Sequence, residues 1–149
     1  MIQIVKDTDT SPLFFLQTAH TTYGIRVMNT GHLEHLYYGE RITVVSQDPS
    51  SCAPLVIQRA FAPGNTCTYD REHPQISMED VCLEVGTLGK GDIRDPFLEV
   101  RFADGSVTSD FTFDSYEIIT LKEREQYLQD SGLPHSYSEA ETDSAECLQ

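Results

Sequence analysis

The stretch GKGDIRDPFLEVRFADGSVTSDFTFDSYEII, residues 89–119, decides the fold because it holds two strand patterns joined by a sharp turn. Residues 98–102 alternate apolar and charged side chains, which is the period-2 pattern of a strand with one buried face. Asp104-Gly105 follows at once, and this dipeptide tolerates positive φ at both central positions of a type I′ turn. Residues 98–102 are therefore predicted to fold back antiparallel onto the next strand.

The strand after this turn is predicted to be long and bent. Residues 107–113 place apolar side chains on one face and polar side chains on the other. Tyr116 and Ile118 then continue the apolar pattern on the opposite parity. A β-bulge near Asp114-Ser115 would return both side chains to the core face, and bulges bend strands where sheets curve.

Further strand patterns and turns recur upstream. Asn29-Thr30-Gly31 is predicted to be a three-residue turn, with glycine where φ is positive. At most one short helix is indicated, near 121–130, so the predicted fold class is all-β, an antiparallel β-sandwich. The other strand candidates are 2–5, 13–18, 23–28, 32–39, 41–45, 66–69 and 81–85.

Length and charge narrow the classes of function. A chain of 149 residues suits one domain that buries roughly two-thirds of its unfolded surface, so no metal or disulfide is needed to hold it. The formal net charge of −14 would repel nucleic acid, so a nucleic-acid partner is not expected. A neutral ligand such as a sugar is compatible with this charge.

The cysteines and histidines indicate no metal site and no cofactor. Cys52, Cys67, Cys82 and Cys147 lack the close pairs of tetrahedral zinc sites, and the histidines form no HExxH motif. His32 and His35 stand three apart in a predicted strand and so should lie on opposite faces. The N-terminus has no signal-peptide pattern, and no window holds ~18 consecutive apolar residues. We therefore expect a cytoplasmic chain with reduced thiols and no membrane contact.

The residues alone single out no catalytic group. Glycosidases use two carboxyl groups ~5–9 Å apart, but acidic residues are too abundant here to indicate one pair. Glu99 and Asp110 lie on predicted strand faces that are normally solvated. Asp92, Arg94 and Asp95 are predicted to form an ion-pair network at a corner of the fold, because arginine binds carboxylates bidentately.

Two groups of residues resemble glycoside hydrolase family 36, the bacterial α-galactosidases, in their N-terminal region. The resemblance spans about residues 2–137. The first group is the HLYYG motif at His35–Gly39, preceded by Thr22-Tyr23, Gly31 and Leu33. The second group comprises Gly91, Asp92, Arg94, Pro96, Leu98, Glu99, Val100, Asp104, Gly105, Ser106, Asp110, Phe111, Ser115, Glu117 and Ile118, followed by Gly132-Leu133-Pro134.

This resemblance implies an N-terminal β-supersandwich domain over residues 1–137, incomplete relative to the family. Residues 138–149 would be an acidic polar end or a linker. In the family a (β/α)₈ barrel follows and carries both catalytic aspartates, a nucleophile and an acid/base. Neither lies in this chain, so no catalytic residue is expected here and the chain alone should be inactive. The family's assemblies imply a homo-oligomer.

The resemblance also implies candidate substrate-binding residues. Family assemblies place a loop of this domain over a neighbour's active site, and by position that loop lies around residues 47–51, where Asp48 would face the sugar. Family members often supply an aromatic residue nearby, frequently tryptophan. This chain has no tryptophan, so either Phe61 or Tyr69 would take its place or the contact would be absent.

The function so implied is the non-catalytic N-terminal region of a retaining α-galactosidase that hydrolyses terminal α-galactosyl residues of small oligosaccharides such as melibiose or raffinose. The region would support the barrel and the oligomer, and its carbohydrate partner would be bound through the full-length enzyme. The alternative is a free-standing carbohydrate-binding or assembly module, and a third interpretation is a self-contained β-sandwich hydrolase. Aromatic side chains that would stack on a sugar in the alternative are Tyr23, Tyr37, Tyr38, Tyr69 and Tyr116.

Overall fold

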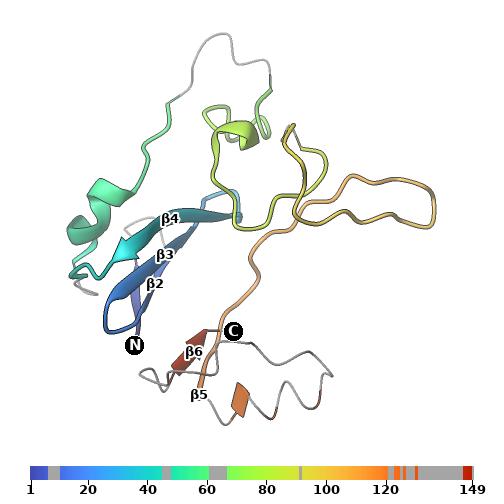
Figure 1. Cartoon of the computed structure of the whole chain (residues 1–149). Helices are drawn as coiled ribbons and strands as arrows, with labels where there is room; N and C mark the ends of the chain where they lie inside the picture. The colour runs from blue at the N-terminus through green and yellow to red at the C-terminus, as the bar shows by residue number, and fades with distance from the viewer. Residues whose placement is uncertain are drawn as a thin grey trace.

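The fold is built on a four-stranded antiparallel sheet whose strands lie in chain order (Figure 1). The computed structural model describes residues 1–6, 11–44, 48–60, 67–90, 92–120, 123–124, 126, 130 and 146–148. The sheet consists of β1 (Ile2–Lys6), β2 (Pro12–Gln17), β3 (Thr21–Val27) and β4 (Leu33–Glu40). The described chain also includes the 3₁₀ helices η1 (Pro49–Leu55) and η2 (Met78–Asp80) and a two-stranded sheet of β5 (Ile118–Thr120) and β6 (Glu146–Leu148). The predicted all-β class with antiparallel pairing is confirmed.

Local sequence explains the β3–β4 hairpin. The Met28 N–H donates to the His32 carbonyl at 2.8 Å, and the Gly31 N–H donates to the Met28 carbonyl at 2.9 Å. Gly31 has φ of +84°, a conformation that glycine adopts at no steric cost. The predicted three-residue turn at 29–31 is therefore confirmed.

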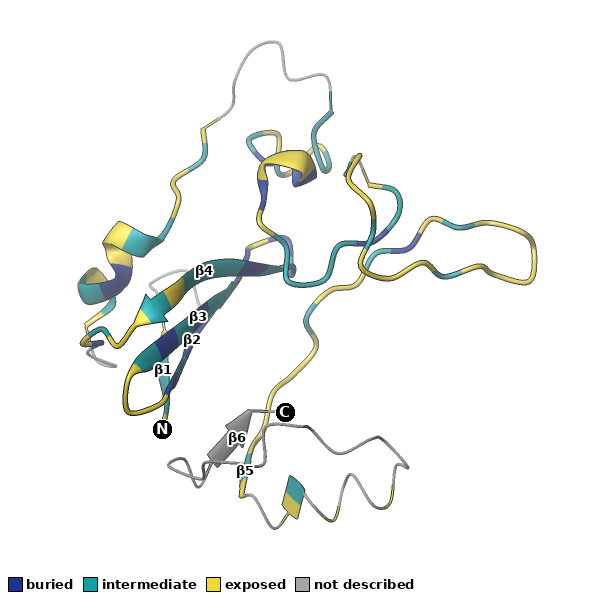
Figure 2. Cartoon of the chain, viewed as in Figure 1, coloured by how far each residue is buried: buried dark blue, intermediate teal, exposed yellow. Residues whose placement is uncertain are grey.

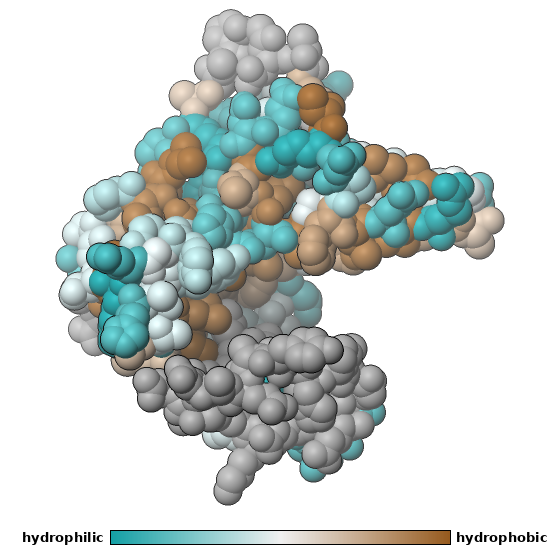
Figure 3. Space-filling model, in the orientation of Figure 1, coloured by the Kyte–Doolittle hydropathy of each residue, from teal (hydrophilic) through white to brown (hydrophobic). Residues whose placement is uncertain are grey.

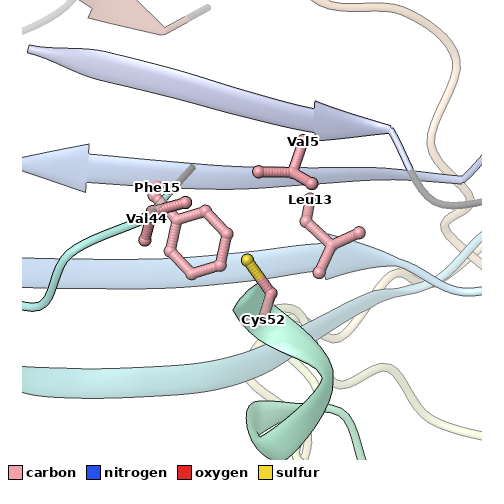
Figure 4. Packing of buried hydrophobic residues seen from close by; sticks show 5 residues of the cluster. All are labelled: Val5, Leu13, Phe15, Val44 and Cys52. Atoms are coloured by element: carbon pink, nitrogen blue, oxygen red, sulfur yellow. The ribbon is translucent and has the colours of Figure 1, made fainter. Parts of the chain in front are cut away.

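The main hydrophobic core lies between the sheet and η1. Figure 4 shows Cys52 of η1 pointing at the sheet, toward Phe15 and Leu13 of β2. Val5 of β1 and Val44 complete this buried cluster. Burying a side chain such as Phe15 stabilises the fold by roughly 1.5–3 kcal/mol, so these contacts hold η1 on the sheet.

The predicted strand 41–45 is not formed over residues 41–44, and Val45 lies outside the described residues. Side chains from the sheet take the hydrogen bonds that a neighbouring strand would otherwise make. The Ile42 N–H donates to Thr22 Oγ1 at 3.1 Å, and Gln17 Nε2 donates to the Ile42 carbonyl at 2.8 Å. This segment therefore follows the sheet without joining it.

A second buried cluster lies beside β4 and contains Met28, Ile76, Met78 and Val81. The predicted strand 81–85 is reduced there to a single bridge between Leu83 and Glu34 of β4. Likewise, no regular strand is formed over 67–69, the described part of candidate 66–69.

Residues 92–117, which we call the arm, leave the sheet as a long excursion (yellow to orange in Figure 1) and are largely exposed (Figure 2). At its tip the Phe102 N–H donates to the Ser106 carbonyl, and the Gly105 N–H to the Phe102 carbonyl, both at 2.9 Å. Only Gly105 in this turn has positive φ. The type I′ prediction was wrong, because the tip repeats the three-residue geometry of the turn at 29–31.

The two strands predicted to flank this tip are not regular strands, so the predicted bulge near 114–115 has no strand to interrupt. Strands with this alternating pattern are stable only when their apolar face packs against another layer. An isolated two-stranded hairpin is only marginally stable in water. Apolar side chains accordingly lie exposed along the arm, as the brown surface in Figure 3 shows. They include Ile93, Phe97, Leu98, Phe102 and Phe111.

The C-terminal predictions fall mostly outside the described residues. Of the predicted tail, 138–149, only Glu146–Leu148 is described, as strand β6, which pairs with β5. No helix within the described ranges is long and apolar enough to cross a membrane.

Candidate functional site

A polar cluster centred on Asp110 joins the β3–β4 turn to the base of the arm. Oδ1 of Asp110 lies 2.8 Å from His32 Nε2, and Oδ2 accepts a hydrogen bond from the Tyr69 hydroxyl at 2.8 Å. Because an ionised carboxylate only accepts, His32 Nε2 is the donor. On the other side of the ring, His32 Nδ1 lies 2.9 Å from Thr30 Oγ1. Asp110 is thus held by groups from two distant segments.

Tyr69 is the side chain around which this cluster packs. The His32 ring meets it edge-on, with centroids 5.0 Å apart and an interplanar angle of 86°. The Lys90 ammonium lies 5.5 Å from the Tyr69 centroid and 3.4 Å from Asp110 Oδ2. A cation above an aromatic face is attracted by the ring quadrupole, so Lys90 contacts both halves of the Tyr69–Asp110 pair favourably.

The electrostatics fix the protonation states of this pair. Burial acts to raise the pKa of Asp110, but hydrogen bonds from His32 and Tyr69 outweigh it and hold the pKa below its usual value. Burial, followed by the hydrogen bond to Asp110, raises the pKa of Tyr69 to about 12. At neutral pH the pair is therefore a carboxylate and a neutral phenol. The Tyr69–Asp110 hydrogen bond therefore holds two segments of the fold together. It supplies no protonated carboxyl group that could donate a proton to a glycosidic oxygen.

The expectation of a solvated Asp110 was wrong, since only 21% of its side chain is exposed. Its partners come from 41 and 78 residues away, and no local pattern announces them. Glu99 does lie in solvent, as expected, with Arg101 at 3.8 Å. The Arg94 guanidinium binds Asp92 bidentately through two hydrogen bonds of 2.9 Å, while Asp95 is exposed.

The predicted residue Asp48 is exposed and caps η1. Its Oδ1 accepts hydrogen bonds from the Ser50 N–H at 3.0 Å and from the Ser50 hydroxyl at 2.6 Å. This is the usual role of aspartate before a helical turn, with Pro49 at the first position.

The structure does not bring Asp48 and Tyr69 together. Asp48 begins the helix that packs on the main core, whereas Tyr69 packs on the second cluster beside β4. Phe61, the other aromatic candidate, lies outside the described residues.

Sequence reasoning missed a fully buried carboxylate, Glu34 of β4. Its two oxygens pair with Arg26 Nε and Arg59 Nη2, and Arg59 also donates to the Asp80 carbonyl at 3.2 Å. Arg26 lies directly opposite Glu34 in the β3–β4 register, so the hairpin prediction contained the signal for that half of the cluster. Both arginines also line a cavity of about 190 Å³.

A second missed group joins Glu84 to the β3–β4 hairpin. Glu84 accepts a hydrogen bond from the Tyr23 hydroxyl at 2.5 Å through Oε2, and its Oε1 lies 2.9 Å from His35 Nδ1. Burial, followed by the hydrogen bond to Glu84, raises the pKa of Tyr23 to about 12. His32 and His35 thus bind separate carboxylates.

Within the described part of the chain, no three histidine, cysteine or acidic side chains converge as a metal site. Cys52, Cys67 and Cys82 are free thiols.

Comparison with known proteins gives a consistent result. The family described as "Glycosyl hydrolase family 36 N-terminal domain" matches residues 31–148. The bifunctional α-galactosidase/sucrose kinase AgaSK of Mediterraneibacter gnavus is 35% identical over 117 residues, which make up 78% of this chain and 12% of that protein.

Solved structures agree. The α-galactosidase from Lactobacillus brevis has a TM-score of 0.62 at 30% identity, over 78% of this chain and 14% of that chain. The α-galactosidase AgaA of Geobacillus stearothermophilus, solved in complex with raffinose, has a TM-score of 0.60 over 72% of this chain and 14% of that chain; at 21% identity this likeness concerns the fold alone. The chain thus spans only a small part of the proteins it matches.

Proposed function

Because the chain belongs to the N-terminal domains of glycosyl hydrolase family 36, we propose that it is a non-catalytic region of a retaining α-galactosidase. That enzyme would remove terminal α-galactosyl residues from small oligosaccharides. The observation that carries the proposal is the family match over residues 31–148, together with relatives named as α-galactosidases.

The chemistry of the described carboxylates supports a non-catalytic role. Retaining glycosidases require two carboxyl groups about 5 Å apart that face the substrate. Glu34 is bound by two arginines, Asp110 by a phenol and an imidazole, and Glu84 by another such pair. Both oxygens of each of these carboxylates are thus bound by side chains of the protein. The catalytic aspartates would belong to a barrel in the rest of the enzyme.

We further propose that the arm contacts that barrel or a neighbouring subunit. Its support is the exposure of large apolar side chains, 83% for Ile93 and 80% for Phe97. Contiguous apolar surface of this kind marks interaction sites. Assembly into a homo-oligomer and a cytoplasmic location are part of the same proposal.

Asp48 and Tyr69 are proposed as substrate-facing residues of the assembled enzyme. Asp48 suits this role because it lies exposed at the start of η1. A free-standing carbohydrate-binding module is the second candidate function, and the exposed ring of Tyr38 favours it.

The test is α-galactosidase activity on an aryl α-galactoside. The 149-residue chain is assayed alone and as a replacement for the matching segment of the M. gnavus enzyme. We expect no activity from the chain alone and restored activity in the chimera, relative to the same enzyme lacking the segment. Turnover by the 149 residues alone would contradict the proposal, as would a chimera no more active than the truncated enzyme.

A further inference from the structure

A β-bulge gathers aromatic and polar side chains on one face of the β3–β4 hairpin. Gly24 pairs with Tyr37 and Ile25 pairs with His35, so Leu36 is the extra residue of β4. Strict alternation would place His35 and Tyr38, which are three apart, on opposite faces. Because of the bulge, His35 and Tyr38 lie on the same face of the sheet. Both side chains pack against Tyr23 of the neighbouring strand.

The Tyr23 ring packs edge-on against the rings of His35 and Tyr38. Its ring centroid lies 5.1 Å from that of His35 and 5.9 Å from that of Tyr38, with interplanar angles of 60° and 62°. Tyr38 itself is 69% exposed, so most of its ring is open to solvent. An exposed ring held at a fixed angle by a half-buried one is a pre-organised contact surface.

The polar groups on this face of the hairpin are also held in place by hydrogen bonds. Glu84 accepts from the Tyr23 hydroxyl and from His35 Nδ1, so the carboxylate determines which imidazole nitrogen carries the proton. In the neutral ring Nε2 is then an acceptor, and the described residues offer it no partner. With 29% of the His35 side chain exposed, this acceptor is available beside the Tyr38 ring.

We propose that Tyr23, Tyr38, His35 and Glu84 form a surface binding site for a neutral pyranoside. The apolar C–H face of the sugar stacks on Tyr38, and a sugar hydroxyl donates to His35 Nε2. We call these four residues the Tyr38 site.

Charge and size favour a sugar over other ligands. The net charge of −14 and the carboxylate of Glu84 disfavour anions. A stable protein interface buries about 800 Å² on each partner, whereas the Tyr38 site presents one exposed ring and one acceptor. A single sugar ring matches these contacts. The Tyr38 site is distinct from Asp48 and Tyr69 and operates without a barrel, so its test is independent of the proposed catalytic assembly.

The test is a titration of the full 149-residue chain with raffinose and with methyl α-galactoside, followed by NMR of backbone and aromatic signals. We expect saturable shifts at Tyr38 and His35. Tyr38→Ala should weaken the affinity about tenfold or more, since the loss of ring stacking and apolar contact exceeds 1.4 kcal/mol. Tyr38→Phe keeps the ring and should stay within about twofold of the original chain.

Phe97→Ala is the matched control, because it removes an exposed aromatic ring of the arm. It should bind as the original chain does, and each variant's amide spectrum verifies its fold. The absence of saturable shifts in the original chain overturns the proposal. So does unchanged affinity in Tyr38→Ala, or equal losses in Tyr38→Ala and Phe97→Ala.

Discussion

The hydroxyl of Tyr69 donates to the carboxylate of Asp110 at 2.8 Å, which connects the second buried cluster with the base of the arm across 41 residues of sequence. Tyr69→Phe removes this one hydrogen bond while keeping the ring under Lys90. We expect a loss of about 1–2 kcal/mol in the free energy of unfolding, because the acceptor is charged and partly buried. Urea denaturation measures it, with Tyr116→Phe as a control that should change stability by less than about 0.5 kcal/mol. Equal losses in both variants would refute this role for the hydroxyl.

Acid should weaken the hydrogen bonds that Asp110 accepts from Tyr69 and His32. The folded pKa of Asp110 lies below the unfolded value, so its contribution is present above the unfolded pKa and is lost as pH falls through the folded one. Stability should therefore decline below about pH 4, the usual range of an unfolded aspartate. Asp110→Asn removes this group from the titration and should flatten the decline. Parallel stability curves for the two chains below pH 4 would show that other carboxylates dominate.

The stability contributed by Tyr23 and Tyr69 should be lost at high pH, whereas that contributed by Asp110 is lost at low pH. The folded pKa values of Tyr23 and Tyr69 are raised from 10.0 to about 12, so the stability that each contributes is complete below pH 10 and is lost as pH rises toward 12. Tyrosinate absorbance of the folded chain should show two phenols that ionise later than the rest. Tyr69→Phe should remove one of the two late ionisations, and a titration with all phenols near 10 would contradict the prediction.

Loss of Glu34 should be more damaging than loss of any surface acid. Glu34→Ala leaves the partly exposed guanidinium groups of Arg26 and Arg59 without their shared counter-charge, and Nη1 of Arg59 already lacks a partner among the described groups. We expect destabilisation of about 3–5 kcal/mol, enough to unfold much of a marginally stable domain. Urea midpoints measure it. Glu99→Ala, which breaks only an exposed pair, should cost less than about 1 kcal/mol.

If the chain carrying Glu34→Ala does not fold, a triple variant still tests the idea. Glu34→Leu combined with Arg26→Met and Arg59→Met removes all three charges together, and apolar replacement of a buried ion cluster is often neutral. The triple variant should therefore be more stable than Glu34→Ala. A triple variant no more stable than the single one would show that packing, rather than charge balance, sets the cost.

Two substitutions separate the structural and functional roles of Asp48. Asp48→Ala removes the cap of η1 and should cost about 1 kcal/mol, whereas Asp48→Asn keeps an oxygen acceptor and should cost little. In the M. gnavus chimera, a sugar-facing carboxylate predicts a raised KM for both variants. A KM unchanged in Asp48→Asn would leave Asp48 with capping alone.

Sequence predicted the fold best where the information is local. Strands β1 to β4 follow from short alternating or apolar runs, and the turn at 29–31 follows from one glycine. The strands predicted over 98–102 and 107–113 have patterns of the same quality, but a strand needs a partner layer as well as a pattern. Phe113 and Tyr116 at the base of the arm pack on Phe14 of β2. Farther out, large apolar side chains such as Phe97 and Phe102 stay exposed, and no regular strand forms.

The candidate site was harder to predict, because its contacts join distant segments. Tyr69 was chosen for its aromatic ring, yet its partner Asp110 was assigned to solvent. The pairing of Arg26 with Glu34 could be derived from the hairpin register, whereas Arg59 reaches Glu34 from a loop whose course no pattern specifies. Bulges add a further difficulty, since one extra residue at Leu36 changes which side chains share a face with Tyr38.

Gly31 sets the direction of the arm as well as the turn of the hairpin. Its carbonyl accepts from the Phe113 N–H at 2.7 Å, and a Cβ at this position would lie 3.1 Å from that of Thr112. The base of the arm therefore contacts the hairpin at the glycine of its turn. A methyl group added at Gly31 would displace the neighbouring backbone by a few tenths of an ångström. Because the arm extends far beyond this contact, the same change would move its tip much farther.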